Sequence, residues 1–246
     1  MANWQDPQVT GVNAATVGVP RAVRDAGLRS YMLSVYNYMA SGVLLTGIIA
    51  LLFAPYAGDV LLSQSGRGMS ALGWIVTLSP LGIVFAMSFG AQRMRTGTLQ
   101  LLFWAFASLM GLSMSTLFLV YTGTSIAQTF FATAAAYMGL SLYGYTTKRD
   151  LSGFGTFLIM GVVGILVAMV INMFLQSSAM ALAISAIGVL LFAGLTAYDT
   201  QRIKSMYFYV QGTEMAGKTV ILGALTLYLD FINMFQFLLS FMGDRR

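Results

Sequence analysis

Histidine and cysteine are absent from this chain of 246 residues, and charged residues make up only 9% of it. Without cysteine there are no disulfides and no thiolate metal sites, and without histidine there are no imidazole ligands or histidine-based hydrolase sites. Carboxylates are left as the side chains that sense mildly acidic pH. The sequence also lacks a nucleophile–base pair, a phosphate-binding loop and a zinc motif, so we expect neither an enzyme nor a bound cofactor.

Apolar residues, by contrast, are abundant. They make up 58% of the chain, whereas a soluble domain is roughly one-quarter charged. Stretches long enough to cross the ~30 Å hydrocarbon layer recur with short gaps between them. We therefore predict an all-α membrane protein with seven transmembrane helices, at Tyr31–Phe53, Leu72–Gly90, Thr98–Val120, Ile126–Tyr145, Phe154–Leu175, Ala179–Tyr198 and Thr219–Met242.

The remaining residues fall into one tail and short connections. Residues 1–20 are polar and lack the basic region and apolar core of a signal peptide, so we expect a disordered cytoplasmic N-terminal tail. Residues 21–246 are expected to form a single seven-helix transmembrane domain. The longest connections are 55–71, which is rich in Gly and Ser, and 201–218, which contains a small aromatic patch.

The distribution of basic residues predicts the orientation in the membrane. One side would carry ten of them and the other three, which places the N-terminus in the cytoplasm and the C-terminus in the periplasm of a bacterial inner membrane. The basic residues are spread over four cytoplasmic segments, so we expect contact with the lipid bilayer and no nucleic-acid binding. The cytoplasmic set is Arg21, Arg24, Arg29, Arg93, Arg95, Lys148, Arg149, Arg202, Lys204 and Lys218, and the opposite set is Arg67, Arg245 and Arg246.

Asp230 stands inside the last apolar run, about eleven residues or roughly 16 Å from its cytoplasmic end. A charge at such depth costs roughly 2.5–3.5 kcal/mol on insertion, so it indicates a functional site. Thr226 and Asn233 share its helix face, and Asn172 lies on a small-residue face of the fifth predicted span. Ordinary close packing of helices explains the small residues on these faces, but it does not explain Asp230.

A second acid, Asp199, lies at the cytoplasmic end of the sixth predicted span. Consecutive antiparallel helices can bring it to Asp230, and two dehydrated carboxylates would share a proton or hold a cation. Ca²⁺ suits such oxygens, but two carboxylates fall short of its usual six to eight ligands, so binding at Asp199 and Asp230 would be weak. Arg93 is the natural counter-charge, although a basic residue of a cytoplasmic loop and an acid at a helix end also explain Arg93 and Asp199.

Two stretches resemble the sixth and seventh spans of the Bax inhibitor-1 family, also called the transmembrane Bax inhibitor motif family. They are Ala197-Tyr-Asp-Thr-Gln-Arg-Ile-Lys204 and Leu225-Thr-Leu-Tyr-Leu-Asp-Phe-Ile-Asn-Met-Phe-Gln-Phe-Leu-Leu239, with further matches at 139–144, 148–151 and 172–174. The resemblance implies a bundle whose central seventh helix is wrapped by the other six. It also implies a calcium leak that is sensitive to pH.

The resemblance further assigns roles to individual residues. An aspartate pair that senses pH matches Asp199 and Asp230, and an arginine that latches to this pair in the closed state matches Arg93, with Arg95 as the neighbouring alternative. The connection 205–218 is longer than in some relatives. Bacterial members are also linked to a membrane-anchored AAA protease as substrate or modulator.

The function predicted from the sequence is therefore a pH-sensitive leak of calcium and other cations, gated by protonation of a buried aspartate pair. Calcium ions and protons would be its ligands. Two alternatives stay open: a non-conducting regulator or substrate of membrane protein quality control, and a proton-coupled transporter that uses the same acids as a relay.

Overall fold

The structure is a computed structural model that describes residues 21–63 and 68–246, without the side chains of residues 21–24. The predicted N-terminal tail at 1–20 and the basic residue Arg67 lie outside the described residues. The helices in chain order are α1 (Arg21–Leu61), α2 (Ala71–Gly90), α3 (Thr96–Met114), α4 (Leu117–Val120), α5 (Gly123–Thr146), α6 (Ser152–Leu175), α7 (Ser178–Val210) and α8 (Met215–Met242). The prediction of an all-α protein is confirmed.

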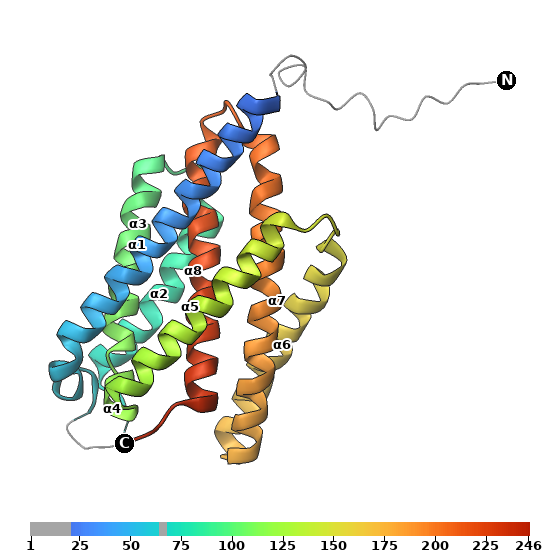
Figure 1. Ribbon diagram of the computed structural model, residues 1–246. Coiled ribbons are helices and arrows are strands. Elements are labelled where there is room, and N and C mark those ends of the chain that lie inside the picture. The colour runs from blue at the N-terminus through green and yellow to red at the C-terminus, as the bar shows by residue number, and fades with distance from the viewer. Residues whose placement is uncertain (1–20, 64–67) are drawn as a thin grey trace.

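Six helices of the described chain are long and apolar enough to cross a membrane: α1, α2, α3 together with α4, α6, α7 and α8. The chain is therefore an integral membrane protein. The remaining long helix, α5, has 24 residues and runs alongside the others in Figure 1, but it is less apolar. The reason is a row of hydroxyl side chains that it buries, which is described below.

The long helices run up and down between two ends of one bundle (Figure 1). The last helix, α8, packs against α7, α1, α5 and α3, while α2 packs on α3 and α6 on α7. In its most apolar stretch 61% of α8 is buried, against 11% for α6. The last helix is thus an interior helix and α6 is a peripheral one.

Two predicted loops are shorter in the structure, because the helices before them continue further than predicted. The loop predicted after Phe53 begins only after Leu61, because α1 continues through Pro55. Proline inside a helix removes a hydrogen bond and is unfavourable. Here the continued helix buries Ala57 and Leu61 against Val76 of α2, which offsets that cost.

The second of these helices is α7, which continues past Tyr198 to Val210. Its last turns remain helical because they pack: Ile203 is buried, and the ring of Tyr207 lies 5.4 Å from the ring of Tyr31 in α1. The long loop predicted at 201–218 therefore shrinks to the turn at residues 211–214. Gly212 adopts a positive φ of 75° in this turn, a conformation that glycine reaches without strain.

Basic residues gather at one end of the bundle. Lys218 at the start of α8 donates to the carbonyl of Gln92 in the α2–α3 turn, and Lys204 of α7 donates to the carbonyl of Tyr145 near the end of α5. The C-terminus lies at the other end (Figure 1), where the Thr122 amide donates to the carbonyl of Asp244. Lys204 and Lys218 thus lie at the end of the bundle opposite the C-terminus.

Candidate functional site

Asp199 of α7 and Asp230 of α8 lie side by side in the bundle and form what we call the carboxylate pair. Asp199 comes eleven residues before the end of α7, and Asp230 comes fifteen residues after the start of α8. Because the two helices are antiparallel and joined by a short turn, these positions fall at a similar level. Their carboxyl groups are close enough to interact electrostatically, and the residues are only 7% and 4% exposed.

Two neighbouring buried carboxyl groups have limited ways to satisfy each other. An ionised carboxylate only accepts hydrogen bonds, so a hydrogen bond between Asp199 and Asp230 would require a proton on one of them. The second oxygen of Asp230, Oδ2, is buried and has no hydrogen-bond partner in the described chain. The carboxylate pair is therefore able to hold one more proton or ligand than its protein neighbours supply.

The cation beside the pair is Arg202. Its Nη1 lies 3.9 Å from Oδ1 of Asp199, one turn further along α7, and its side chain is 56% exposed. This arginine was not singled out from the sequence, because the helix was expected to end before it. The expected latch, Arg93, lies exposed in the α2–α3 turn, as does Arg95 nearby, and within the described residues neither lies within 4 Å of a carboxylate. Its role stays a prediction.

One face of α5 presents hydroxyl groups to the core. These residues recur at every fourth position, are all buried, and are together called the hydroxyl stripe: Ser125, Thr129, Thr133, Tyr137 and Ser141. The opposite face of α5 is apolar and exposed, at Phe131, Met138 and Leu142. This pattern is the reverse of a helix that turns its polar face to water. The i, i+4 spacing is visible in the sequence and is the signal that sequence reasoning missed.

The stripe reaches the carboxylate pair with its last two residues, Tyr137 and Ser141. Tyr137 interacts electrostatically with both Asp230 and Asp199, and its hydroxyl donates to the carbonyl of Leu227 at 3.2 Å. Further along, the hydroxyl of Ser141 is 3.0 Å from that of Thr200, the residue next to Asp199. A polar wall thus borders the buried acids on the α5 side.

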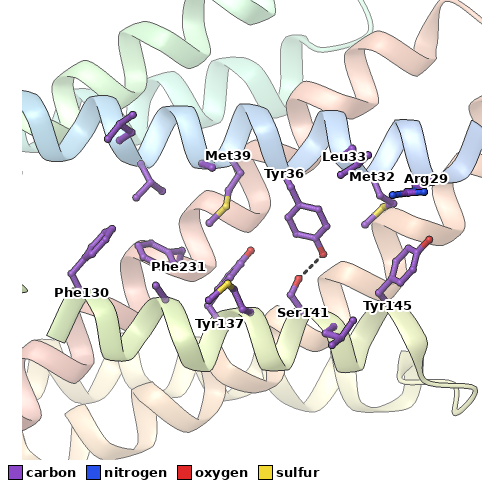
Figure 2. A pocket seen from close by; sticks show the side chains of 16 residues that line it. Arg29, Met32, Leu33, Tyr36, Met39, Phe130, Tyr137, Ser141, Tyr145 and Phe231 are labelled. Atoms are coloured by element: carbon purple, nitrogen blue, oxygen red, sulfur yellow. Dashed lines mark hydrogen bonds between the residues drawn. The ribbon is translucent and has the colours of Figure 1, made fainter. Parts of the chain in front are cut away.

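Tyr36 of α1 extends this wall. Its hydroxyl is 2.5 Å from the hydroxyl of Ser141, which is shown by the dashed line in Figure 2. Together with Thr200 these residues form a chain of three hydroxyls from α1 through α5 to α7. A hydroxyl group both donates and accepts a hydrogen bond. Each bond in this series can therefore polarise the next one, as far as Thr200 beside the carboxylate pair.

A glycine lets α5 approach α7 beside the pair. A Cβ on Gly144 would collide with the backbone carbonyl of Ala197, two residues before Asp199. The backbones can come this close only because position 144 has no side chain. Close approach at this point fixes the distance between the stripe and the carboxylate pair.

The remaining predicted polar residues lie elsewhere. Asn172 and Asn233 line one cavity of about 440 Å³ between α6, α7 and α8. Asn233 donates to the carbonyl of Leu229, and Asn172 accepts from the amide of Ser177 at the end of α6. Thr226 bonds its own helix at Leu222. The structure thus brings Asn172 and Asn233 together but places none of the three in a hydrogen bond with the pair.

Comparison with known proteins agrees with the motifs around the pair. The family model described as "Inhibitor of apoptosis-promoting Bax1" matches residues 28–246, which include every candidate residue named above. The chain belongs to the Bax inhibitor-1 family.

Bacterial relatives of this Bax inhibitor-1 protein match it almost from end to end. A Rickettsia prowazekii protein is 48% identical over 90% of this chain and 92% of its own length. A Caulobacter vibrioides protein is 47% identical, over 90% and 91%. The Escherichia coli relative, 45% identical over 90% and 94%, bears the name inner membrane protein YbhL.

Proposed function

We propose that this Bax inhibitor-1 protein is a pH-sensitive cation leak, with Ca²⁺ as the ion and the carboxylate pair as the gate. The observation that carries the proposal is the contact of Asp199 with Asp230, both almost fully enclosed between α7 and α8. An unpaired charge inside a membrane is costly and marks an ion or proton pathway when no structural partner explains it. Arg202 partners Asp199, but it leaves Oδ2 of Asp230 without a partner in the described chain.

The proposal includes a topology. The less apolar helix α5 also crosses the membrane, which gives seven spans, and α8 is the central one that the others surround. The basic end of the bundle faces the cytoplasm of the bacterial inner membrane, with the N-terminus, and the C-terminus faces the periplasm. Packing of α8 on α1, α3, α5 and α7 supports the central position.

The gate would work through charge. With one shared proton the pair carries a single negative charge and holds α7 to α8. A second proton neutralises the pair, so the two carboxyl groups no longer share one proton and one charge, the contact of α7 with α8 loosens and the leak rises. Arg202, on the same helix as Asp199, would set how readily the pair takes up that proton. At stronger acidity the carboxylates no longer attract a cation, and the leak falls again.

The route for the ion would follow the hydroxyl stripe. It runs along α5 from Ser125, which accepts a hydrogen bond from the Asp244 amide at the C-terminal end, to Ser141 above the pair. Hydroxyl oxygens and water would complete the shell of Ca²⁺, because no group of three or more acidic side chains occurs in the described chain. Passage through such a weak site suits a leak, and we propose no resident cofactor and no enzymatic step.

Purified protein in lipid vesicles tests the proposal. Vesicles that contain a calcium-sensitive dye should take up Ca²⁺, more at mildly acidic than at alkaline pH, while empty vesicles should not. Ca²⁺ uptake that requires an opposing proton gradient would support a proton-coupled transporter instead. Absence of uptake at every pH, from folded protein, would overturn the leak and favour a regulator that acts with a membrane-anchored AAA protease.

A further inference from the structure

A long groove lies between α1 and α5 on the outside of the bundle. It encloses about 770 Å³, within the range of about 300–1,000 Å³ of pockets that hold small ligands. Both helices pack on α8, and Phe231 of α8 lines the groove with them (Figure 2). We call it the α1–α5 groove.

The α1–α5 groove is apolar along its length. Its floor includes the buried side chains of Met39 and Phe231, and its rims include Leu44 and Met138, which are 64% and 66% exposed. In an integral membrane protein, exposed apolar side chains of this kind face the acyl chains of the lipids. The groove is therefore open to lipid acyl chains and not to water.

The α1–α5 groove also has the length of a lipid chain. From Arg29 to Val43, both of which line it, α1 rises roughly 21 Å at 1.5 Å per residue. One leaflet of the hydrocarbon layer is about 15 Å deep, half of its ~30 Å. A second cavity of about 310 Å³ shares Val43, Leu44 and Phe130 and continues the groove toward the other end.

Positive charge stands at one end of the groove only. Arg29 and Tyr145 face one another there (Figure 2), and Arg29 is exposed and makes no ion pair within the described residues. Lys204 adjoins the same end, because its ammonium lies 4.8 Å from the ring centre of Tyr145 and donates to the Tyr145 carbonyl. A ligand with an apolar chain and an anionic head matches this arrangement.

We propose that the α1–α5 groove binds one anionic phospholipid of the membrane, with its phosphate at Arg29 and one acyl chain along the groove floor. Arginine is suited to a phosphate because its planar guanidinium donates two parallel hydrogen bonds. The bound acyl chain would lie beside Tyr36. The hydroxyl of Tyr36 is the first of the three hydrogen-bonded hydroxyls that end at Thr200. The proposal goes beyond the cation leak and does not depend on it.

Native mass spectrometry of the purified protein measures lipid binding directly and does not require a measurement of Ca²⁺ flux. Delipidated protein is titrated with phosphatidylglycerol and, separately, with phosphatidylcholine of the same chains. One phosphatidylglycerol should bind in preference to phosphatidylcholine. Arg29→Ala should weaken it about fivefold, the factor that corresponds to about 1 kcal/mol for one cation beside an anionic lipid, and should leave phosphatidylcholine binding unchanged.

A second variant tests the acyl chain. Ala40 lines the groove and is exposed, so Ala40→Trp should fill the groove and abolish binding of the single lipid. The matched controls are Ala136→Trp on an exposed position of α5 outside the groove lining, and Arg149→Ala, an exposed arginine at the basic end. Both controls should bind as the parent does.

Three results would overturn the proposal. Equal binding of phosphatidylglycerol and phosphatidylcholine would mean that the protein binds only unspecific annular lipid. Equal loss in Ala40→Trp and Ala136→Trp would show that the groove is not the site. A dimer that Ala40→Trp dissociates, with no lipid retained by the parent, would assign the groove to a second copy of the chain. Since Arg29 is exposed, Arg29→Ala decides the headgroup contact even if Ala40→Trp does not fold.

Discussion

Replacing Asp230 with Asn is the sharpest perturbation of the carboxylate pair. Asparagine keeps the shape of the side chain, and its amide N–H₂ can donate to the Asp199 carboxylate in place of the shared proton. The variant therefore fixes the hydrogen bond of the pair at every pH. This bonded pair with a single negative charge is the state that holds α7 to α8, so we expect Ca²⁺ uptake into vesicles to stay near the level that the parent shows at alkaline pH and to lose its rise in mild acid.

The same substitution separates gating from folding. Asp230 is 4% exposed and its Oδ2 has no partner, so Asp230→Asn removes a buried group that is only partly satisfied. The free energy of unfolding should then stay within about 1 kcal/mol of the parent, or rise. Asp230→Leu instead leaves the Asp199 carboxyl without this hydrogen bond and should cost about 1–3 kcal/mol. Thermal unfolding in detergent compares the two variants.

Asp150→Asn is the matched control. Asp150 is exposed in the α5–α6 connection, and hydrogen bonds from the side chain and backbone of Ser152 lower its pKa below the usual value. It therefore stays ionised across the tested range, and its neutralisation should leave the pH dependence of Ca²⁺ uptake intact. The reasoning is refuted if Asp230→Asn is folded and keeps the parent's response to pH, or if both variants lose it.

Three further substitutions test the surroundings of the pair. Arg202→Ala should shift the pH at which Ca²⁺ uptake rises. The free energy of unfolding should change by less than about 1 kcal/mol, because the ion pair is half-exposed. Arg93→Ala, measured in parallel, tests the latch, and the role of Arg202 is contradicted if only Arg93→Ala shifts the pH response. Ser141→Ala leaves two hydroxyls without a shared partner and should cost about 1–3 kcal/mol in thermal unfolding, so an unchanged unfolding temperature would contradict the hydroxyl chain. Gly144→Ala should destabilise by about 1–3 kcal/mol through overpacking against α7, whereas Gly139→Ala on the same helix, where a Cβ meets nothing within 4 Å, should be neutral or stabilising.

The sequence predicted the pair itself because a charge in an apolar run is visible without a structure. Asp230 interrupts a run of more than twenty residues, and Asp199 precedes it on the neighbouring antiparallel helix. The end of α7 could not be predicted in the same way. Polar residues such as Gln201 suggest a loop, but in the structure Gln201 stays helical and bonds the α5–α6 connection through the Leu151 amide and the Arg149 carbonyl.

The hydroxyl stripe illustrates a different limit. Its five residues alternate with alanine, glycine and apolar side chains. They lower the average hydropathy of α5, but the helix contains no charged residue that would mark a polar site in the sequence. Only burial tells whether such a face turns inward or toward lipid. Here the exposed side chains of Phe131 and Met138 show that it turns inward, toward α7 and α8.

Arg202 and Arg93 differ in what their contacts require of the protein. Arg202 is three residues from Asp199 on one helix, so their distance is set within α7 and survives movement of the other helices. Arg93 is in the α2–α3 turn, and a contact with the carboxylate pair would need this turn to move relative to α7 and α8. An ion pair within α7 tunes when the carboxylates take up a proton, while an ion pair from Arg93 would join two separate parts of the bundle and could release them. A shifted pH response in Arg202→Ala together with a raised leak at alkaline pH in Arg93→Ala would therefore mean that sensing and latching belong to different arginines.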